Sequence, residues 1–398
     1  MNIWIFNHHA LTPDMGGGTR HYDFSKELVK KGHKVTIFAS SFHYSRHQEL
    51  KEYSGEYFLH ENTNGIDFIW LKTRPYKDSG IGRVINMLDY MKKVQKVALT
   101  CKENPDIIIG SSVHLFAVYA AYKVAKKLRV PFIMEVRDIW PQTLIDMGIS
   151  KWHPFVLFLG VLEKLLYKKA DKIITNLPFA YKHIEKFGVK RENIVWISNG
   201  VDLSAFENLT TKKTETFLVT YTGSIAQANV LDSLFEVAKR LKNIDTIKFK
   251  LYGDGAYFQK YQKYIQDNKL ENIELMGLVS KNDIPQILVN SDVLYLGLKD
   301  SPLYRYGISL NKIFDYLASN RPIIFASNAR NNPVQDSKSG ITIKPENADE
   351  LEKAIIELYS MREEDRKSRF NNGFEYVKNN FSVQFLTNKL ENLINGLQ

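Results

Sequence analysis

The sequence predicts an α/β protein made of two successive domains, each with a parallel sheet covered by helices. Short apolar runs alternate with amphipathic segments along the chain, which is the spacing typical of β-α units. With 398 residues, 44% of them hydrophobic, the chain is long enough to form two cores. A polar stretch at 207–216 interrupts the alternation near the middle of the chain.

The apolar runs give the expected strands in order. Those of the first domain lie at 3–6, 35–39, 107–109, 132–136 and 173–175. A helix is expected at 23–31, and Gly32 is expected to end it. Those of the second domain lie at 217–221, 248–252, 273–275, 293–296 and 323–325. The domains are expected at 1–205 and 206–379, followed by an amphipathic C-terminal helix within 380–398.

Composition narrows the range of partners. The formal charge is +10 and the pI is near 9.2, but the basic residues are scattered, so phosphorylated ligands or an anionic membrane are favoured over nucleic acid. The one cysteine excludes an internal disulfide, and the histidines show no metal-ligand spacing, so no metal is expected. The N-terminus lacks the basic start of a signal peptide and the apolar run at 155–162 is too short to span a bilayer, which predicts a cytoplasmic protein.

The segment 306–325 carries the strongest functional signal. It reads as a glycine-bearing loop, a short amphipathic helix and a buried strand. Ser309 and Asn311 stand where N-capping is expected, and Lys312 adds a charge beside a helix start that suits phosphate. Asp315, one turn later, can accept hydrogen bonds from a ribose. The segment therefore predicts a nucleotide-sugar site, and the alternative is an ordinary helix–strand unit.

Residues 309–316, Ser-Leu-Asn-Lys-Ile-Phe-Asp-Tyr, resemble the donor-binding segment of GT-B glycosyltransferases of family 4. The variant is similar to that of the N-acetyl-L-fucosamine transferases of capsule and O-antigen assembly. The family pattern has two glutamates separated by seven residues, whereas this chain has Gly307 and Asp315 at those places. The resemblance implies two Rossmann-like domains facing across a cleft, a last helix returning to the first domain, a UDP-sugar as co-substrate and no cofactor.

Other segments of the second domain fit the donor site of this family. Gly223 and Ser224 follow a strand, and Asn229 comes five residues later. The resemblance places an arginine and a lysine where Ser224 and Asn229 stand, so charge for the diphosphate has to come from elsewhere. Lys299, Arg305 and Lys312 are the candidates for this source, and Arg305 is preferred. Gly253 is expected to let the backbone pass close to the nucleotide.

Two segments of the first domain are candidates for the sugar and the acceptor. Gly17 and Gly18 lie between a strand and a helix, where glycines allow the backbone to approach phosphate or sugar; the alternative is a surface turn. Glu135, Arg137 and Asp138 stand at the carboxyl end of a strand, where open α/β sheets bind ligands. Asp138 or Glu135 would orient or deprotonate the acceptor hydroxyl, and Arg137 would bind a phosphate. The alternative is a structural Arg–carboxylate pair.

Basic and apolar side chains are interleaved in 74–102 and again in 152–169. Such segments are typical of helices that lie on anionic membrane, although ordinary covering helices with solvated lysines fit equally well.

The sequence thus predicts a transferase on the inner face of the plasma membrane. It would move an N-acetylamino sugar, by resemblance N-acetylfucosamine, from a UDP-sugar to a polyprenyl-diphosphate-linked saccharide in surface polysaccharide biosynthesis. Two alternatives stay open. A UDP-N-acetylglucosamine 2-epimerase would have the same fold, and a non-catalytic basic protein would bind membrane or nucleic acid without binding a nucleotide-sugar.

Overall fold

The computed structural model describes residues 1–77, 80–112, 114–211 and 215–397. It divides into two compact units, Met1–Ser198 with Leu386–Gln398, and Asn199–Phe385. The division falls before the expected 205/206 boundary. Asn199 belongs to the second unit because its backbone N–H donates to Ser309 Oγ at 2.8 Å and its side chain donates to the Ser309 carbonyl at 2.6 Å.

Within the described residues of the first unit, eight strands form one sheet in the order β10-β9-β8-β7-β1-β2-β6-β5. β5 and β6 pair as an antiparallel hairpin, and the other neighbours in the sheet are parallel. The strands are β1 (Asn2–Phe6), β2 (Lys34–Ser40), β5 (Phe58–Thr63), β6 (Ile66–Leu71), β7 (Ile107–Ser111), β8 (Phe132–Val136), β9 (Lys172–Thr175) and β10 (Ile194–Trp196), with β3 (Phe42–His43) and β4 (Gln48–Glu49) as a separate pair.

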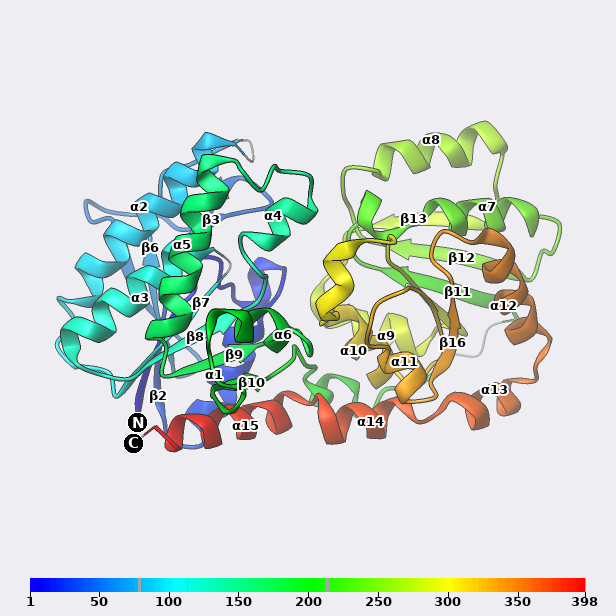
Figure 1. Ribbon diagram of the computed structural model, residues 1–398. Helices are drawn as coiled ribbons and strands as arrows, with labels where there is room; N and C mark the ends of the chain where they lie inside the picture. The colour runs from blue at the N-terminus through cyan, green and yellow to red at the C-terminus, as the bar shows by residue number, and fades with distance from the viewer. Residues whose placement is uncertain (78–79, 113, 212–214, 398) are drawn as a thin grey trace. The chain divides into compact units, whose positions relative to one another are not determined.

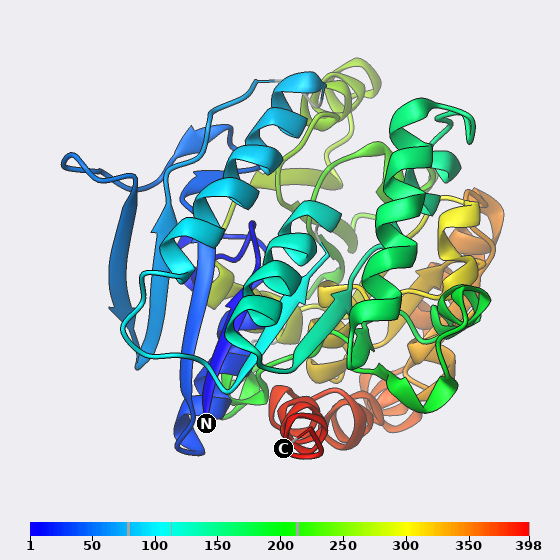
Figure 2. The same ribbon diagram turned by 60° about the vertical axis from the view of Figure 1, so that its left-hand side comes forward.

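Helices cover both faces of this sheet. They are α1 (Arg20–Lys30), α2 (Ile81–Ala98), α3 (Leu115–Leu128), α4 (Gln142–Asp146), α5 (Pro154–Lys169), α6 (Tyr181–Ile184) and the end of α15 (Val383–Asn395). α2, α3 and α5 lie side by side on one face (Figure 1 and Figure 2). Gly110 of β7 lets α3 come close, since a Cβ there would be 2.7 Å from the Ala121 methyl. The neighbouring Ile109 points to the other face, where it lines a small cavity with Phe24 of α1 and Leu390 of α15.

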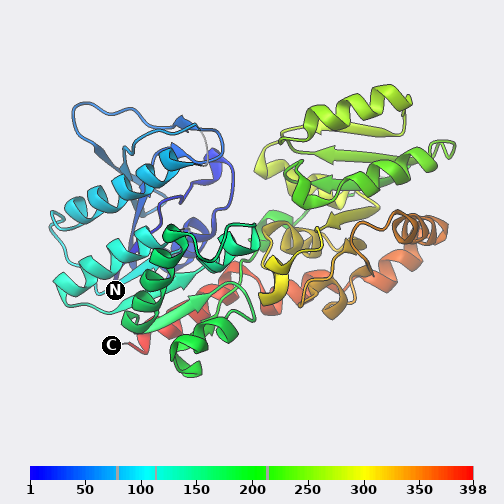
Figure 3. The same ribbon diagram turned by 45° about the horizontal axis from the view of Figure 1, so that its top comes forward.

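The described part of the second unit has a six-stranded sheet, parallel throughout, in the order β13-β12-β11-β14-β15-β16 (Figure 1 and Figure 3). Its strands are β11 (Phe217–Thr222), β12 (Ile247–Tyr252), β13 (Ile273–Gly277), β14 (Val293–Gly297), β15 (Ile323–Ala326) and β16 (Gly340–Ile343). Its helices are α7 (Asp232–Arg240), α8 (Phe258–Asn268), α9 (Ile284–Val289), α10 (Asn311–Ala318), α11 (Pro333–Asp336), α12 (Ala348–Ser360), α13 (Glu363–Phe370) and α14 (Gly373–Asn380).

The core of the second unit lies between the sheet and helices from distant parts of the chain. Phe235 of α7 stacks on Tyr261 of α8 with the ring centres 4.2 Å apart, and both are buried. α10 packs against α14, where Phe314 meets Phe381 at 4.7 Å. Tyr316 fixes α10 to the end of β11, because its hydroxyl accepts a hydrogen bond from the Thr222 N–H at 2.7 Å. This contact positions the start of α10 next to the end of β11.

The predicted fold class, two Rossmann-like units with parallel sheets, is confirmed. All ten apolar runs taken as strands lie within strands of the structure. The helix expected at 23–31 begins earlier, at Arg20, and β5, β6, β10 and β16 have no counterpart among the predicted strands. Of the described helices, none combines the length and the apolar character that crossing a bilayer requires.

Candidate active site

The residue at the N-cap of α10 does not cap the backbone amides of the first turn. This residue is Leu310, in extended conformation, and its apolar side chain makes no capping hydrogen bond. The expected capping roles of Ser309 and Asn311 are therefore wrong. Asn311 is already helical, and the Ser309 hydroxyl accepts a hydrogen bond from Asn199 instead. An uncapped helix start keeps its N–H groups and partial positive charge available to an anion.

Lys312 adds a full charge at this helix start. Its ammonium donates to Tyr221 Oη at 3.0 Å and to Asn229 Oδ1 at 3.1 Å, and lies 4.7 Å from the centre of the Tyr221 ring. No carboxylate in the described part of the chain forms an ion pair with it. Burial lowers the pKa of Lys312 to about 8. An ammonium held only by neutral groups retains its charge and a third N–H for a ligand.

Ser224 and Asn229 orient this lysine. Tyr221 Oη donates to the Ser224 carbonyl at 2.7 Å, and Asn229 Nδ2 donates to the same carbonyl at 2.8 Å. The side chains of Tyr221 and Asn229 thereby turn their acceptor oxygens toward Lys312. Ser224 and Asn229 stand where the family carries basic residues, and here they position the basic residue that another helix supplies.

Glycines bring three strand ends together beside Lys312. The Gly223 N–H donates to the Tyr252 carbonyl, and the Gly253 N–H donates to the Gly277 carbonyl, both at 2.8 Å. A Cβ on Gly223 would lie 2.5 Å from Lys312 Nζ, and a Cβ on Gly253, at φ +145°, would lie 1.8 Å from the Gly223 carbonyl oxygen. Gly253 thus packs directly on Gly223, and Gly223 leaves room for the lysine.

Asp315 and Arg305 differ in their relation to Lys312. Asp315 is partly exposed and follows Lys312 by three residues, which places both side chains on one side of α10. Arg305 is exposed; its Nε donates to the Pro302 carbonyl at 2.8 Å, and its guanidinium lies 5.8 Å from the centre of the Tyr306 ring. Lys312 is thus the cation that the cluster holds, and a role for Arg305 as a source of charge stays a prediction.

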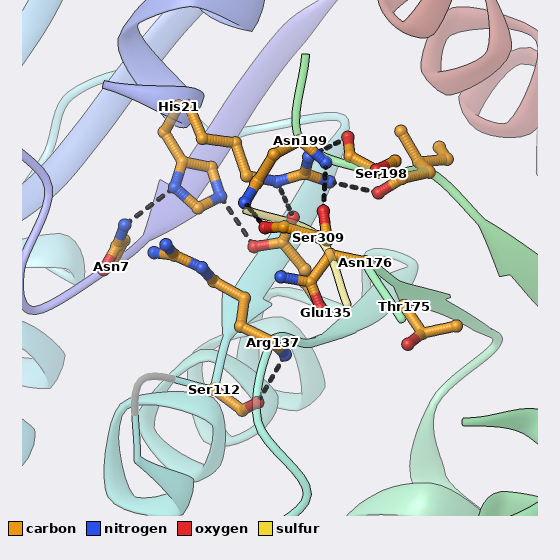
Figure 4. Close-up of polar contacts among 12 residues, drawn as sticks. Asn7, His21, Ser112, Glu135, Arg137, Thr175, Asn176, Ser198, Asn199 and Ser309 are labelled. Carbon is orange, nitrogen blue, oxygen red and sulfur yellow. Dashed lines mark hydrogen bonds and ion pairs between the residues drawn. The ribbon is translucent and has the colours of Figure 1, made fainter. Parts of the chain in front are cut away.

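In the first unit, Glu135 at the end of β8 is enclosed by basic side chains (Figure 4). Its Oε1 accepts from Arg20 Nε and its Oε2 contacts His21 Nε2, both at 2.8 Å. The Arg20 guanidinium also donates to the carbonyls of Ile197 and Ser198. His21 Nδ1 accepts from the Asn7 amide at 2.7 Å, which leaves the proton on Nε2, facing Glu135.

This enclosure removes Glu135 from the candidates for a general base. Glu135 is 2% exposed. Burial by itself would raise its pKa, but the interactions with His21 and Arg20 outweigh burial and hold the pKa well below its usual value. A base has to reach the acceptor hydroxyl and take its proton. The catalytic role expected for Glu135 is therefore corrected to a structural one. Its arginine partner is Arg20, not the neighbouring Arg137.

Arg137 and Asp138 are the accessible polar groups of this strand end. The backbone N–H of Arg137 donates to Ser112 Oγ at 3.1 Å. Its guanidinium (Figure 4) forms no ion pair with a described carboxylate, although its charge helps to lower the pKa of Glu135. Asp138 is exposed. Desolvation by the surrounding protein raises its pKa, against the opposing charges of Arg137 and Arg83. Of the two carboxylates predicted for this site, Glu135 and Asp138, it is thus Asp138 that can reach a substrate.

The glycine loop between β1 and α1 includes Gly17 and Gly18. Gly17 has φ +97°, and a Cβ there would lie 2.9 Å from Leu11 Cδ1, so a side chain is disfavoured by both conformation and space. Gly18 precedes Thr19, the N-cap of α1. Gly17 therefore has the special backbone conformation that the sequence suggested, and the role of both glycines in ligand binding stays a prediction.

Sequence reasoning missed a group of histidines. His8, His9 and His114 have ring nitrogens within 4.8 Å of one another, although they are far apart in the sequence. They meet because β1 pairs with β7, so the residues that follow the two strands lie at the same edge of the sheet. The signal available in the sequence was that His8 and His114 each follow an apolar run that predicts a strand.

Comparison with known proteins shows which enzymes both units of the chain resemble. Residues 15–205 match Glycosyltransferase Family 4, and residues 216–361 match Glycosyl transferases group 1. The sucrose-phosphate synthase of Thermosynechococcus elongatus superposes with a TM-score of 0.76 at 14% identity, over 100% of this chain and 98% of that one. The chain is a GT-B glycosyltransferase.

Two further proteins are similar to this glycosyltransferase. The glycosyl transferase WcaI of Escherichia coli (strain K12), provisionally named for colanic acid biosynthesis, is 21% identical over 310 residues, 73% of this chain and 75% of WcaI. The Anabaena protein HepE, crystallised with UDP and glucose, has a TM-score of 0.70 at 14% identity over 100% of this chain and 99% of HepE. At such identity the structural likeness shows the fold.

Proposed function

We propose that this glycosyltransferase moves an N-acetylamino sugar from a UDP-sugar to a polyprenyl-diphosphate-linked saccharide during surface polysaccharide biosynthesis. The observation that carries the donor assignment is Lys312, a cation held by neutral groups at the uncapped start of α10. A diphosphate supplies the missing negative charge. The name of WcaI supports a role in surface polysaccharide biosynthesis, and the HepE complex with UDP supports UDP as the nucleotide. N-acetylfucosamine as the sugar rests on the resemblance of residues 309–316.

The chemistry follows from the charges. As the bond between the anomeric carbon and the diphosphate breaks, negative charge grows on the leaving UDP, and Lys312 with the N–H groups of α10 stabilises it. The acceptor hydroxyl forms the new bond to the anomeric carbon and loses its proton. We assign Asp138 as the group that takes this proton, because Glu135 is enclosed. Asp315 binds the ribose hydroxyls. No metal enters this scheme.

A transfer assay tests the proposal. Purified protein is incubated with lipid-linked monosaccharide in vesicles and a panel of UDP-sugars, and the glycolipid and released UDP are quantified. Growth of the glycolipid with UDP-N-acetylamino sugars, in a one-to-one ratio to UDP, is the expected result. UDP release without glycolipid growth rejects the acceptor. Conversion of UDP-N-acetylglucosamine without any acceptor identifies an epimerase instead.

The pH dependence of UDP affinity should report Lys312. Its pKa of about 8 in the free protein rises when the diphosphate binds, because the anion favours the charged form. Affinity is therefore expected to be constant below pH 8 and to fall above it, by at most about tenfold per pH unit. Calorimetry at pH 7–9 in two buffers of different ionisation enthalpy measures the accompanying proton uptake. Lys312→Arg should bind without this dependence, and an identical pH profile in that variant would contradict the assignment.

The acceptor proposal includes contact with an anionic membrane, and α5 is the surface that supports it. Leu157, Phe158 and Val161 of α5 are 49%, 54% and 72% exposed on one side of the helix, and Trp152 just before it is 72% exposed. Lys164 and other exposed lysines flank these side chains. An apolar stripe bordered by lysines suits the headgroup region of acidic lipid.

Val161→Glu should weaken binding to vesicles that contain acidic lipid by about tenfold or more, because it places a like charge in the apolar stripe. Vesicle flotation measures the bound fraction. Leu278→Glu, at a site in the second unit that is 73% exposed, is the matched control. Equal flotation of both variants would reject α5 as the membrane surface.

A further inference from the structure

The His8, His9 and His114 group contains buried hydrogen-bond donors that no described residue satisfies. His8 and His114 are fully buried. His8 Nε2 and both ring nitrogens of His9 are buried without a hydrogen-bond partner, and so is Arg83 Nε, in the first turn of α2. Each such group costs about 1–3 kcal/mol when left unpaired. Several at one strand edge indicate a place built for a ligand.

The hydrogen bonds fix the protons on two of these rings. His114 Nδ1 accepts from the Ala117 N–H at 3.2 Å, so the proton of this ring is on Nε2. His114 Nε2 lies 2.6 Å from His8 Nδ1 and donates to it. The remaining proton of His8 is therefore on Nε2, the atom without a partner. The His8 ring cannot turn away, because it is stacked between His9 and Tyr90 with centres 4.3 Å apart on both sides.

This arrangement does not suit a metal ion. A metal needs the lone pair of each ligating nitrogen. Here the Nε2–H of His114 points to His8, and the Nε2–H of His8 points away from His114, so neither Nε2 offers a lone pair. The positive charges nearby also disfavour a cation. Burial first, and then the charges of Arg83 and Arg137, lower the pKa of His9 to about 3. The histidines are thus neutral donors in a positive field.

The two arginines are not held by carboxylates in direct contact. Neither Arg83 nor Arg137 forms an ion pair with any carboxylate among the described residues, although Asp138 is near enough for both charges to lower its pKa, and both also lower the pKa of His9. Their donors, and those of His8 and His9, come from the ends of β1 and β8 and from α2. A phosphoryl group, with oxygens directed several ways, can accept from such a set, whereas the two oxygens of a carboxylate lie in one plane.

We propose that Arg83, Arg137, His8 and His9 form an anion site in the first unit, which takes a phosphoryl or diphosphoryl group other than that of the donor nucleotide. This deepens the proposed function and rests on it, since the diphosphate of a polyprenyl-linked acceptor has this chemistry. Free phosphate or pyrophosphate is the other source. His114 is a positioning residue that fixes the proton of His8.

Calorimetry of the full chain at saturating UDP, with the Lys312 site filled, tests the site with pyrophosphate, farnesyl diphosphate and farnesol. Pyrophosphate and farnesyl diphosphate should bind, and farnesol should not. Arg83→Gln and His8→Phe, which keeps a stacked ring, should each weaken binding by about tenfold or more while UDP affinity is unchanged. Lys92→Gln, an exposed position on the same helix, is the control.

Absence of pyrophosphate binding, or equal affinity in all three variants, would overturn the site. Binding of pyrophosphate without farnesyl diphosphate supports the anion site and rejects the lipid as its source. Repeating the titration in Lys312→Ala without UDP separates this proposal from the donor assignment, because the first-unit site should persist there. Nitrogen-15 NMR of the wild-type imidazoles provides a check without substitution. A proton on Nδ1 of His114 would contradict the arrangement.

Discussion

Replacing Lys312 with alanine is expected to weaken UDP binding by about 1–3 kcal/mol, or roughly 5- to 150-fold in Kd. The change removes a charge-assisted hydrogen bond to the diphosphate. It also leaves Tyr221 Oη and Asn229 Oδ1 without the donor that now joins them. Calorimetry with UDP measures the loss, and turnover with the sugar donor should fall further, because charge on the leaving group grows in the transition state.

Lys242→Ala is the control, since Lys242 is an exposed lysine of the same unit. Its UDP affinity should equal that of the unchanged protein. If Lys312→Ala also binds UDP with full affinity, the diphosphate binds elsewhere and the donor assignment fails. Intact folding of this variant is checked by the unfolding transition, because Lys312 is one of two α10 residues that bond to β11. Tyr316 keeps its hydrogen bond to Thr222 in the variant, so α10 should stay in place.

Glu135→Ala should lower the free energy of unfolding by about 3–5 kcal/mol, because it leaves the Arg20 guanidinium buried without its counter-charge. Denaturant unfolding measures this. Glu103→Ala is the control, since Glu103 and Lys34 form an ion pair whose side chains are 68% and 49% exposed, and its loss should cost less than about 1 kcal/mol. Similar losses in both variants would show that the enclosed cluster does not hold the first unit together.

The pKa of Glu135 sets the pH range of this stabilisation. The pKa is depressed in the folded state, so the contribution is fully present at pH values above the ordinary value of a glutamate and is lost as the pH falls below it. The unfolding free energy of Glu135→Gln should therefore vary less with pH in the acidic range than that of the unchanged protein. The same variant separates structure from catalysis, because turnover per folded molecule should be retained if Glu135 is no base.

The donor half of the site could be predicted in large part from local sequence. The helix and strand of 306–325, Lys312 and the glycines Gly223 and Gly253 lie where a phosphate-binding loop and helix start require them. The failures concern side chains whose partners are remote in sequence. Ser309 accepts a hydrogen bond from Asn199 rather than capping α10. Lys312 is the cation of the donor cluster because Tyr221 of β11 and Asn229 of the turn after it accept its hydrogen bonds.

The first unit was harder to predict because its polar residues pair across the sheet. Glu135 and Arg137 alternate on one strand, which indicated a pair within the motif. The structure instead joins Glu135 to Arg20 and His21 on α1. The histidine group depends on the pairing of β1 with β7, and no local pattern in the sequence encodes that register.

Local sequence by itself determined the strands, the succession of two α/β units and the loop that carries the donor charge, because these depend on periodicity and on residue types within one turn or strand. The tertiary structure alone decided which polar groups are buried with a partner and which are left to a ligand. Glu135 is enclosed by basic side chains, whereas Lys312 is held by neutral groups and has no carboxylate partner among the described residues. Hydrogen bonding and burial are settled between segments that only the folded chain brings together.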